Sequence, residues 1–308
     1  MFTYIKDRIV STVIVLIGVS FLAFMILQLV PGDPVQIMAS QSGASGADID
    51  RLRHQLGLDR PIWDQYGRFV LNAVQGDLGR SIQSRQPVAQ MVFDQIPATL
   101  RLTFAGMGVA IVVGLIAGII AAVRARTWID SAIMVVSTLG VAIPSFWFAL
   151  LLIYAFSVHY HWFPAAGGEG LRPLVLPALT LGISGASVIA RLTRSSMLEV
   201  MNQDYIGTAR AKGLRERTVI YRHALKNALI PVVTVAGLQF GGLLSGAVII
   251  ETVFARQGIG RLAVDAILNK DYPLVQGTVL VAATAYVLIN LLVDLLYATL
   301  DPRLRHGN

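Results

Sequence analysis

Few side chains in this sequence could perform catalysis or hold a metal ion. The sequence contains no Cys, which excludes disulfides, thiolate catalysis, iron–sulfur clusters and Cys-based zinc sites. His159 and His161 are close together, but two histidines without a third ligand nearby are weak evidence for a metal site. Neither the phosphate-binding pattern G-x-x-x-x-G-K-[ST] nor H-E-x-x-H occurs. We therefore predict no catalytic, cofactor-binding or metal-binding residue in this chain, which is not expected to be an enzyme.

One serine still has a sequence context that suggests a nucleophile. Gly182-Ile183-Ser184-Gly185 has the G-x-S-G pattern of intramembrane serine proteases. Such a serine needs a histidine base within hydrogen-bond reach, and none of the five histidines lies inside an apolar stretch. We favour a packing role for these small residues, as for the pairs Gly114–Gly118, Gly237–Gly241 and Gly242–Gly246.

The elements that must position these residues are membrane helices. Charged residues make up only 14% of the 308 residues and hydrophobic ones 55%. Six charge-free apolar stretches are each long enough to cross a bilayer as a helix, because a span needs about 20 residues. They are Ile9–Val30, Leu102–Val123, Ser131–Val158, Pro173–Ala190, Ala228–Ile250 and Pro273–Val293. The predicted fold is an all-α polytopic membrane protein with six transmembrane helices, the first of them uncleaved.

The distribution of cations predicts the orientation. With the N-terminus inside, 14 of the 25 Lys and Arg lie inside, and 7 of the other 11 lie in the long outer segment Pro31–Arg101. Both termini are thus expected in the cytoplasm. The predicted parts are an N-terminal helix (1–30), an outer helical segment (31–96), a five-helix core (97–300) with an inner loop (199–227), and a cytoplasmic tail (301–308).

The outer segments contain short amphipathic patterns. Apolar residues recur at helical spacing from Ile62 to Val74, after Pro61 and before Gly76-Asp77. A second such pattern runs from Ile259 to Ile267, and a third comprises Ile49, Leu52 and Leu56. We expect two or three short helices in the first outer segment, either as a brace for the spans or as a docking face for a soluble partner. His159 to Trp162 favour an aromatic belt at the outer surface over a metal site.

The spans lack the groups that a secondary carrier needs. Ionisable residues at mid-membrane depth carry ion coupling, and the six stretches contain none. Asp294 follows the last stretch and could form a structural ion pair with Arg191 or Arg194. Energy for transport must therefore come from a partner, although a stand-alone carrier stays an alternative.

The inner loop between the fourth and fifth spans is unusually ordered for its length. Asp204 is a good N-cap, Tyr205 to Lys212 reads as a short helix, and Gly213 as a left-handed stop. A second helix from Leu214 to Asn227 is rich in Arg and Lys. The positive-inside rule accounts for the cations but not for the caps. This loop therefore looks built to dock into another protein.

The same residues carry a family resemblance. The run Asp204-Tyr205-Ile206-Gly207-Thr208-Ala209-Arg210-Ala211-Lys212-Gly213-Leu214 and the run His223 to Pro231 resemble the cytoplasmic signature loop of ABC importer permeases, in the version of the dipeptide/oligopeptide permease B-type subunit. Further matches are Pro31-Gly32-Asp33-Pro34, Asp271-Tyr272-Pro273 and Asp301-Pro302-Arg303. The general signature has Glu and Pro where this chain has Gly207 and Lys226, while Ala209, Gly213 and Leu225 match it.

The resemblance implies a type I ABC importer transmembrane domain, an inner-membrane location and a set of partners. These partners are a second homologous permease in a heterodimer, two ABC ATPases that bind ATP and Mg²⁺, and a periplasmic or lipid-anchored binding protein. Nucleic acid is not expected as a partner, and membrane lipid is. The loop would be the coupling helix that receives force from the ATPases, through Asp204, Tyr205, Thr208, Ala209, Arg210, Lys212, Gly213, Leu214 and Leu225.

The resemblance leaves the imported solute open. Di- and oligopeptides are the leading expectation, and similar permeases import nickel, glutathione, opines, aminolevulinate or haem. The residues of the substrate path are unknown from the sequence, because the spans are uniformly apolar.

Overall fold

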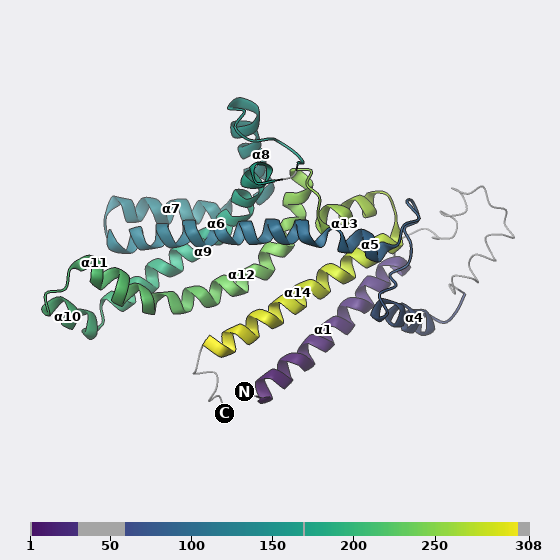
Figure 1. Ribbon diagram of the computed structural model, residues 1–308, viewed down its shortest axis with the longest axis horizontal. Coiled ribbons are helices and arrows are strands. Elements are labelled where there is room, and N and C mark those ends of the chain that lie inside the picture. Colours follow the sequence, from purple (N-terminus) through teal and green to yellow (C-terminus); the bar gives the residue numbers. More distant parts are fainter. Residues whose placement is uncertain (1, 30–58, 169, 301–308) are drawn as a thin grey trace. The chain divides into compact units, whose positions relative to one another are not determined.

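The computed structural model describes residues 2–29, 59–168 and 170–300, without the side chains of 2–5, 7, 26–29 and 294–300 (Figure 1). The helix expected around Ile49, Leu52 and Leu56 and the tail 301–308 lie outside this described part. Within it, every regular element is a helix. The chain divides into two compact units, Met1–Pro97 with Ile259–Asn308, and Ala98–Gly258.

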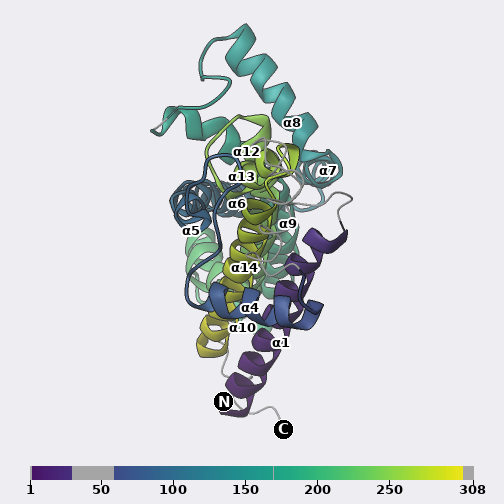
Figure 2. The ribbon, with the colours of Figure 1, turned by 90° about the vertical axis from the view of Figure 1, so that its right-hand side faces the viewer.

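In the residues that the structure describes, the first unit is built on two long helices and three short ones. Helices α1 (Phe2–Leu29) and α14 (Tyr272–Leu300) lie side by side, as Figures 1 and 2 both show. The short helices are α4 (Ile62–Val74), α5 (Val88–Phe93) and α13 (Ile259–Leu268). Both amphipathic helices expected from periodicity, α4 and α13, are confirmed.

Helix α4 packs on α1 through aromatic side chains. The hydroxyl groups of Tyr66 and Ser20 are 2.8 Å apart, and the Phe21 ring lies edge-on to Tyr66 with centroids 5.4 Å apart. Phe24 contacts both Tyr66 and Phe69. These contacts show that α4 packs against the first span, as a brace would, and the docking role for a soluble partner stays a prediction.

The second unit contains the remaining long helices. They are α6 (Ile96–Val123), which begins at the end of the first unit, α7 (Trp128–Ala142), α8 (Ser145–Leu152), α9 (Val175–Met201) and α12 (Leu225–Val253). A π-helix, η1 (Ile153–His159), continues α8, and the 3-10 turn η2 (Arg172–Leu174) precedes α9.

Close helix packing in this unit depends on glycines. A Cβ at Gly114 would lie 2.7 Å from Ile189, and one at Gly118 would lie 2.6 Å from the carbonyl of Ala190, both on α9. Gly182 likewise faces the carbonyl of Gly106. The packing role predicted for Gly114 and Gly118 is confirmed. Gly246 faces Leu181 at 3.1 Å, whereas the Cβ position of Gly242 has no neighbour within 4 Å in this chain, so a packing role for Gly242 stays a prediction.

The third predicted span is broken in the middle. Five helices of the described part are long and apolar enough to cross a membrane, and α7 with α8–η1 makes a sixth if this pair, bent by 108°, counts as one span. Figure 2 shows α8 leaving the end of α7 at a steep angle. The cause is Pro144, which has no N–H to donate and forces Ile143 out of the helical region (φ −75°, ψ 125°). The apolar run Ser131–Val158 predicted a continuous helix, and that expectation is wrong.

Candidate functional site

The loop between α9 and α12 is a polar segment that contains short helices of its own. Helix α10 (Asp204–Ala211) follows α9 after two residues, and Gly213 turns the chain with φ +77°. A short helix, α11 (Glu216–Thr218), and a π-helix, η3 (Val219–Ala224), then run directly into α12. The left-handed stop at Gly213 is confirmed.

Two details of this loop differ from the sequence prediction. The N-cap of α10 is Gln203, which has an extended backbone, and Asp204 occupies the first helical turn. There its carboxylate still favours the helix dipole. The second helix is not separate, because η3 and α12 continue it without a break. Its cations therefore lie at the root of a membrane helix.

One face of α10 is buried inside the chain. Ile206 and Ala209 pack in a cluster with Val219, Ile220 and Ala224, which also includes Ala122 of α6 and Met197 of α9. Leu225 is partly buried against the same cluster. Ala209 and Leu225 thus contact their own chain, and substitutions there act first on this packing.

The other face of the loop is exposed. The predicted coupling residues on it are Asp204, Tyr205, Thr208, Arg210, Lys212, Gly213 and Leu214. Arg210 donates two hydrogen bonds to Glu216, at 2.8 and 3.2 Å, across the Gly213 turn. These bonds raise the pKa of Arg210 above its usual value, so the guanidinium remains charged. The exposed face is therefore polar, and the Arg210–Glu216 ion pair spans the turn within it.

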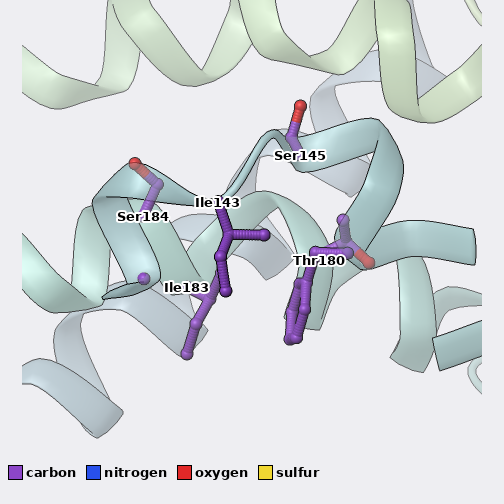
Figure 3. A pocket seen from close by; sticks show the side chains of 7 residues that line it. Ile143, Ser145, Thr180, Ile183 and Ser184 are labelled. Carbon is purple, nitrogen blue, oxygen red and sulfur yellow. The ribbon is translucent and has the colours of Figure 1, made fainter. Parts of the chain in front are cut away.

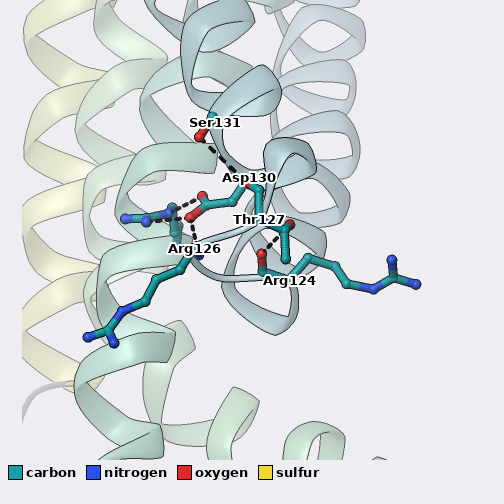
Figure 4. A network of polar contacts seen from close by, with 6 residues as sticks. Arg124, Arg126, Thr127, Asp130 and Ser131 are labelled. Carbon is teal, nitrogen blue, oxygen red and sulfur yellow. Dashed lines mark hydrogen bonds and ion pairs between the residues drawn. The ribbon is translucent and has the colours of Figure 1, made fainter.

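A second polar network ties α7 to α9. Arg194 on α9 forms a two-bond ion pair with Asp130 on α7, with Nη2 donating to Oδ2 at 2.7 Å. The backbone N–H of Arg126, which has φ +63°, donates to the same carboxylate at 3.0 Å. Figure 4 shows this turn, where the Thr127 hydroxyl also donates to the carbonyl of Arg124.

The partner of Arg194 was missed by sequence reasoning. We expected Asp294 to pair with Arg191 or Arg194, and Arg194 is instead engaged by Asp130. The side chain of Asp294 lies outside the described part, so its own partner stays a prediction. The signal for Asp130 was its position directly before an apolar stretch, where a buried carboxylate needs a cation.

A buried carboxylate also lies at the opposite end of α12. Glu251 is 1% exposed and accepts a hydrogen bond of 2.6 Å from Thr99 on α6. Arg256 follows α12 and donates to the carbonyl of Pro173 at 3.1 Å, which ties this end to the start of α9. Burial lowers the pKa of Arg256, and the charge of Glu251 opposes that effect.

A small cavity lies beside the break between α7 and α8. Its volume is about 40 Å³, and Gly140, Ile143, Ser145, Phe148, Thr180, Ile183 and Ser184 line it (Figure 3). Thr180 donates its hydroxyl proton to the carbonyl of Leu176, and the Ser184 side chain is exposed. The neighbouring Gly182 and Gly185 pack against α6, as the packing interpretation of G-x-S-G requires.

The aromatic residues after η1 form a cluster of their own. The rings of Tyr160 and Trp162 lie 5.1 Å apart, and His159 lies edge-on to Tyr160 at 4.7 Å. No group of three or more possible metal ligands occurs in the described residues. The geometry fits the aromatic belt expected at the end of this span.

Known proteins are similar to this chain in sequence and in fold. Residues 114–306 match the family described as the binding-protein-dependent transport system inner membrane component, and residues 1–103 match its N-terminal family. The glutathione transport system permease protein GsiC of Escherichia coli K12 is 43% identical over 306 residues, covering 99% of this chain and all of the relative. The corresponding protein of Shigella boydii serotype 4 is 42% identical over the same length.

Solved structures support the fold. The MetNI methionine ABC transporter in an inward-facing conformation has a TM-score of 0.57 at 22% identity, covering 69% of this chain and 97% of its own. An amino acid ABC transporter has a TM-score of 0.53 at 16% identity, covering 70% and 94%. With the full-length relatives, these matches show that the chain belongs to the family of binding-protein-dependent transport system inner membrane components, as a multi-pass permease subunit of an ABC importer.

Proposed function

We propose that this permease imports small peptides from the periplasm to the cytoplasm. The observation that carries the proposal is the full-length 43% identity to relatives described as glutathione transport permeases, since glutathione is itself a tripeptide. The match spans the whole of those relatives and 99% of this chain.

The proposal includes the subunits around the chain. Permease subunits of ABC importers work with ATPase and substrate-binding partners. In our proposal the partners are a second, homologous permease, two ATPases that bind ATP and Mg²⁺, and a periplasmic or lipid-anchored binding protein. This chain supplies no catalytic group to ATP hydrolysis. It is the two-state element whose inward- and outward-open forms the nucleotide on another chain biases.

We further propose that α10 and the Gly213 turn form the coupling site for an ATPase. Support comes from the fixed exposed face, on which Tyr205, Thr208 and Leu214 stand beside the charged Arg210. When the ATPases close, they apply force to the loop. This force is transmitted through Ile206 and Ala209 to the apolar cluster at the start of α12.

Uptake by the reconstituted complex tests the substrate. The permease, its partner subunits and the binding protein would be placed in liposomes loaded with ATP, with labelled glutathione, a dipeptide and a pentapeptide supplied outside. We expect ATP-dependent uptake of at least one peptide, and competition among those that share the site. Uptake of nickel or haem alone, with no peptide taken up, would contradict the proposal.

A single substitution tests the coupling site. Thr208 is exposed in the middle of α10, so Thr208→Trp should insert and fold normally while blocking contact with an ATPase. Substrate-stimulated ATP hydrolysis and uptake should both be lost, and the binding protein should keep its affinity for ligand. The control is Tyr221→Trp, an exposed aromatic residue of η3 outside the predicted coupling set.

A further inference from the structure

Contacts within the chain hold helix α10 of the inner loop in place. Helix α10 has only eight residues, about 12 Å of length. Isolated helices of this size are unstable in water, so its shape depends on its contacts. One of these contacts is the apolar face of Ile206 and Ala209, which packs on η3.

Two polar contacts then fix the two ends of α10. In its first turn, the Tyr205 hydroxyl accepts a hydrogen bond of 2.7 Å from the Asn227 amide, on the first turns of α12. In its last turn, Arg210 donates to both carboxylate oxygens of Glu216 on α11. We call these two contacts the α10 brace.

The two contacts of the brace connect α10 to the same part of the chain. Both of its contacts lead from α10 to the α11–η3–α12 arm, and the apolar cluster joins α10 to η3 between them. A helix fixed at both ends and along its middle cannot tilt or rotate against that arm without breaking a contact. Gly213 lies in the turn between α10 and α11, and because glycine has more backbone freedom than other residues, the chain would bend there without the brace.

We propose that Arg210, Glu216, Tyr205 and Asn227 are positioning residues that make α10 and the root of α12 a single rigid lever. This inference rests on the proposed coupling role of α10. Force applied to α10 then moves α12 directly, and is not absorbed by bending at Gly213. The four residues need not touch the ATPase for this role.

Charge exchange in the reconstituted complex tests the ionic half of the brace. Arg210→Glu and Glu216→Arg each place like charges across the turn, whereas the double exchange restores an opposite pair. Each single variant should lower substrate-stimulated ATP hydrolysis and uptake per ATP by about two- to fivefold, the range for an exposed pair of this kind. The double variant should recover most of the loss. Arg217→Glu, an equal charge change on the neighbouring exposed cation, is the matched control and should have little effect.

A covalent rescue tests rigidity itself. Because the sequence has no Cys, Arg210→Cys with Glu216→Cys gives a chain with only these two thiols. Coupling should fall in the reduced double variant and return when a short thiol-to-thiol crosslinker joins the two positions. A crosslink that abolishes transport would show that the turn must open during the cycle, and would overturn the inference.

The remaining outcomes separate this inference from the coupling role. If Thr208→Trp abolishes stimulation but Glu216→Arg matches the Arg217→Glu control, the brace inference is wrong and the coupling role stands. The same holds if the Arg210→Glu effect is not recovered by the double exchange, because Arg210 would then act by its own contact with the partner. If neither Thr208→Trp nor the brace variants change stimulation, the coupling role itself is wrong.

Discussion

Two corners of the molecule are held by carboxylates in opposite ways. At the corner between α13 and α14, Asp271 is 2% exposed and accepts hydrogen bonds from the Ser81 hydroxyl and the Ile82 N–H. At the inner loop, Glu216 holds Arg210 with more than half of its side chain in solvent. The Asp130–Arg194 pair lies between these extremes, with a buried carboxylate and a partly exposed cation.

The buried and the exposed carboxylate should differ in what their removal affects, which is the stability of the fold for one and the function of the protein for the other. A buried carboxylate is costly to remove, because its donors are left without partners away from water. An exposed ion pair contributes little to stability, because water and salt screen it. We therefore expect Asp271 to determine whether the protein folds, and Glu216 to affect only how it works. Three carboxylate substitutions test this gradient, and a fourth, at Gly213, tests the turn that the Glu216 contact spans.

The largest effect is expected at Asp271. Asp271→Ala leaves the Ser81 hydroxyl and the Ile82 N–H unpaired, which should destabilise the first unit by about 2–4 kcal/mol. The measurement is thermal unfolding in detergent, together with the amount of protein in the membrane. Asp265→Ala is the control, since that exposed carboxylate has an i,i+4 contact with Arg261 at 3.6 Å. If the two variants were equally stable, the expectation that burial of Asp271 makes it important for folding would be wrong.

Asp130→Ala should have the second largest effect. It strips Arg194 of its ion pair and the Arg126 N–H of its acceptor, at a cost of about 1–3 kcal/mol. Arg194→Lys keeps the charge but loses the two-bond geometry, so it should retain part of the stability. Thermal unfolding of both variants measures the difference. A loss for Arg194→Lys as large as for Asp130→Ala would show that the two-bond geometry matters more than the charge.

Gly213→Val should follow. Its backbone has φ +77°, which a β-branched residue resists by about 1–2 kcal/mol. The strain should distort the exit of α10 and reduce stimulated ATP hydrolysis without preventing membrane insertion. Gly207→Ala is the matched control, because that glycine lies within α10 with open space around its Cβ position. It should stabilise the helix by about 0.5–1 kcal/mol, so its unfolding should shift in the direction opposite to that of Gly213→Val.

The smallest effect on stability is expected at Glu216. Glu216→Gln keeps the size of the side chain and removes its charge, so unfolding should shift by no more than about 0.5 kcal/mol. Coupling should nevertheless weaken, and high salt should weaken it in the native chain as well. A destabilisation comparable to that of Asp271→Ala would refute the contrast between the two corners.

Much of this architecture could be predicted from the sequence. The positions of the long helices follow from apolar length, and α4 and α13 from helical periodicity. Gly213 was predicted to be left-handed because a glycine after a cationic helix end is a strong local signal. These features depend on local sequence, which is why they could be read directly.

The missed features depend on contacts between distant residues or on a single backbone group. Asp130 stands 64 positions before Arg194, and nothing local identifies the pair. The brace likewise joins Tyr205 to Asn227 over 22 positions. The break at Pro144 does have a local signal, because proline interrupts a helix, but a prediction from apolar length alone overlooks it. The π-helical turns η1 and η3 have no pattern that distinguishes them from an ordinary helix.

The contact between Glu251 and Gly258 has an evolutionary consequence. A Cβ at residue 258 would occupy the space of the Glu251 carboxylate, so any larger residue at 258 collides with it. Conversely, a shorter side chain at 251 loses the hydrogen bond from Thr99 and opens room at 258. We therefore expect a substitution at either position alone to disturb the packing at this end of α12. Among descendants of this chain, the glutamate and the glycine should be inherited together or replaced together.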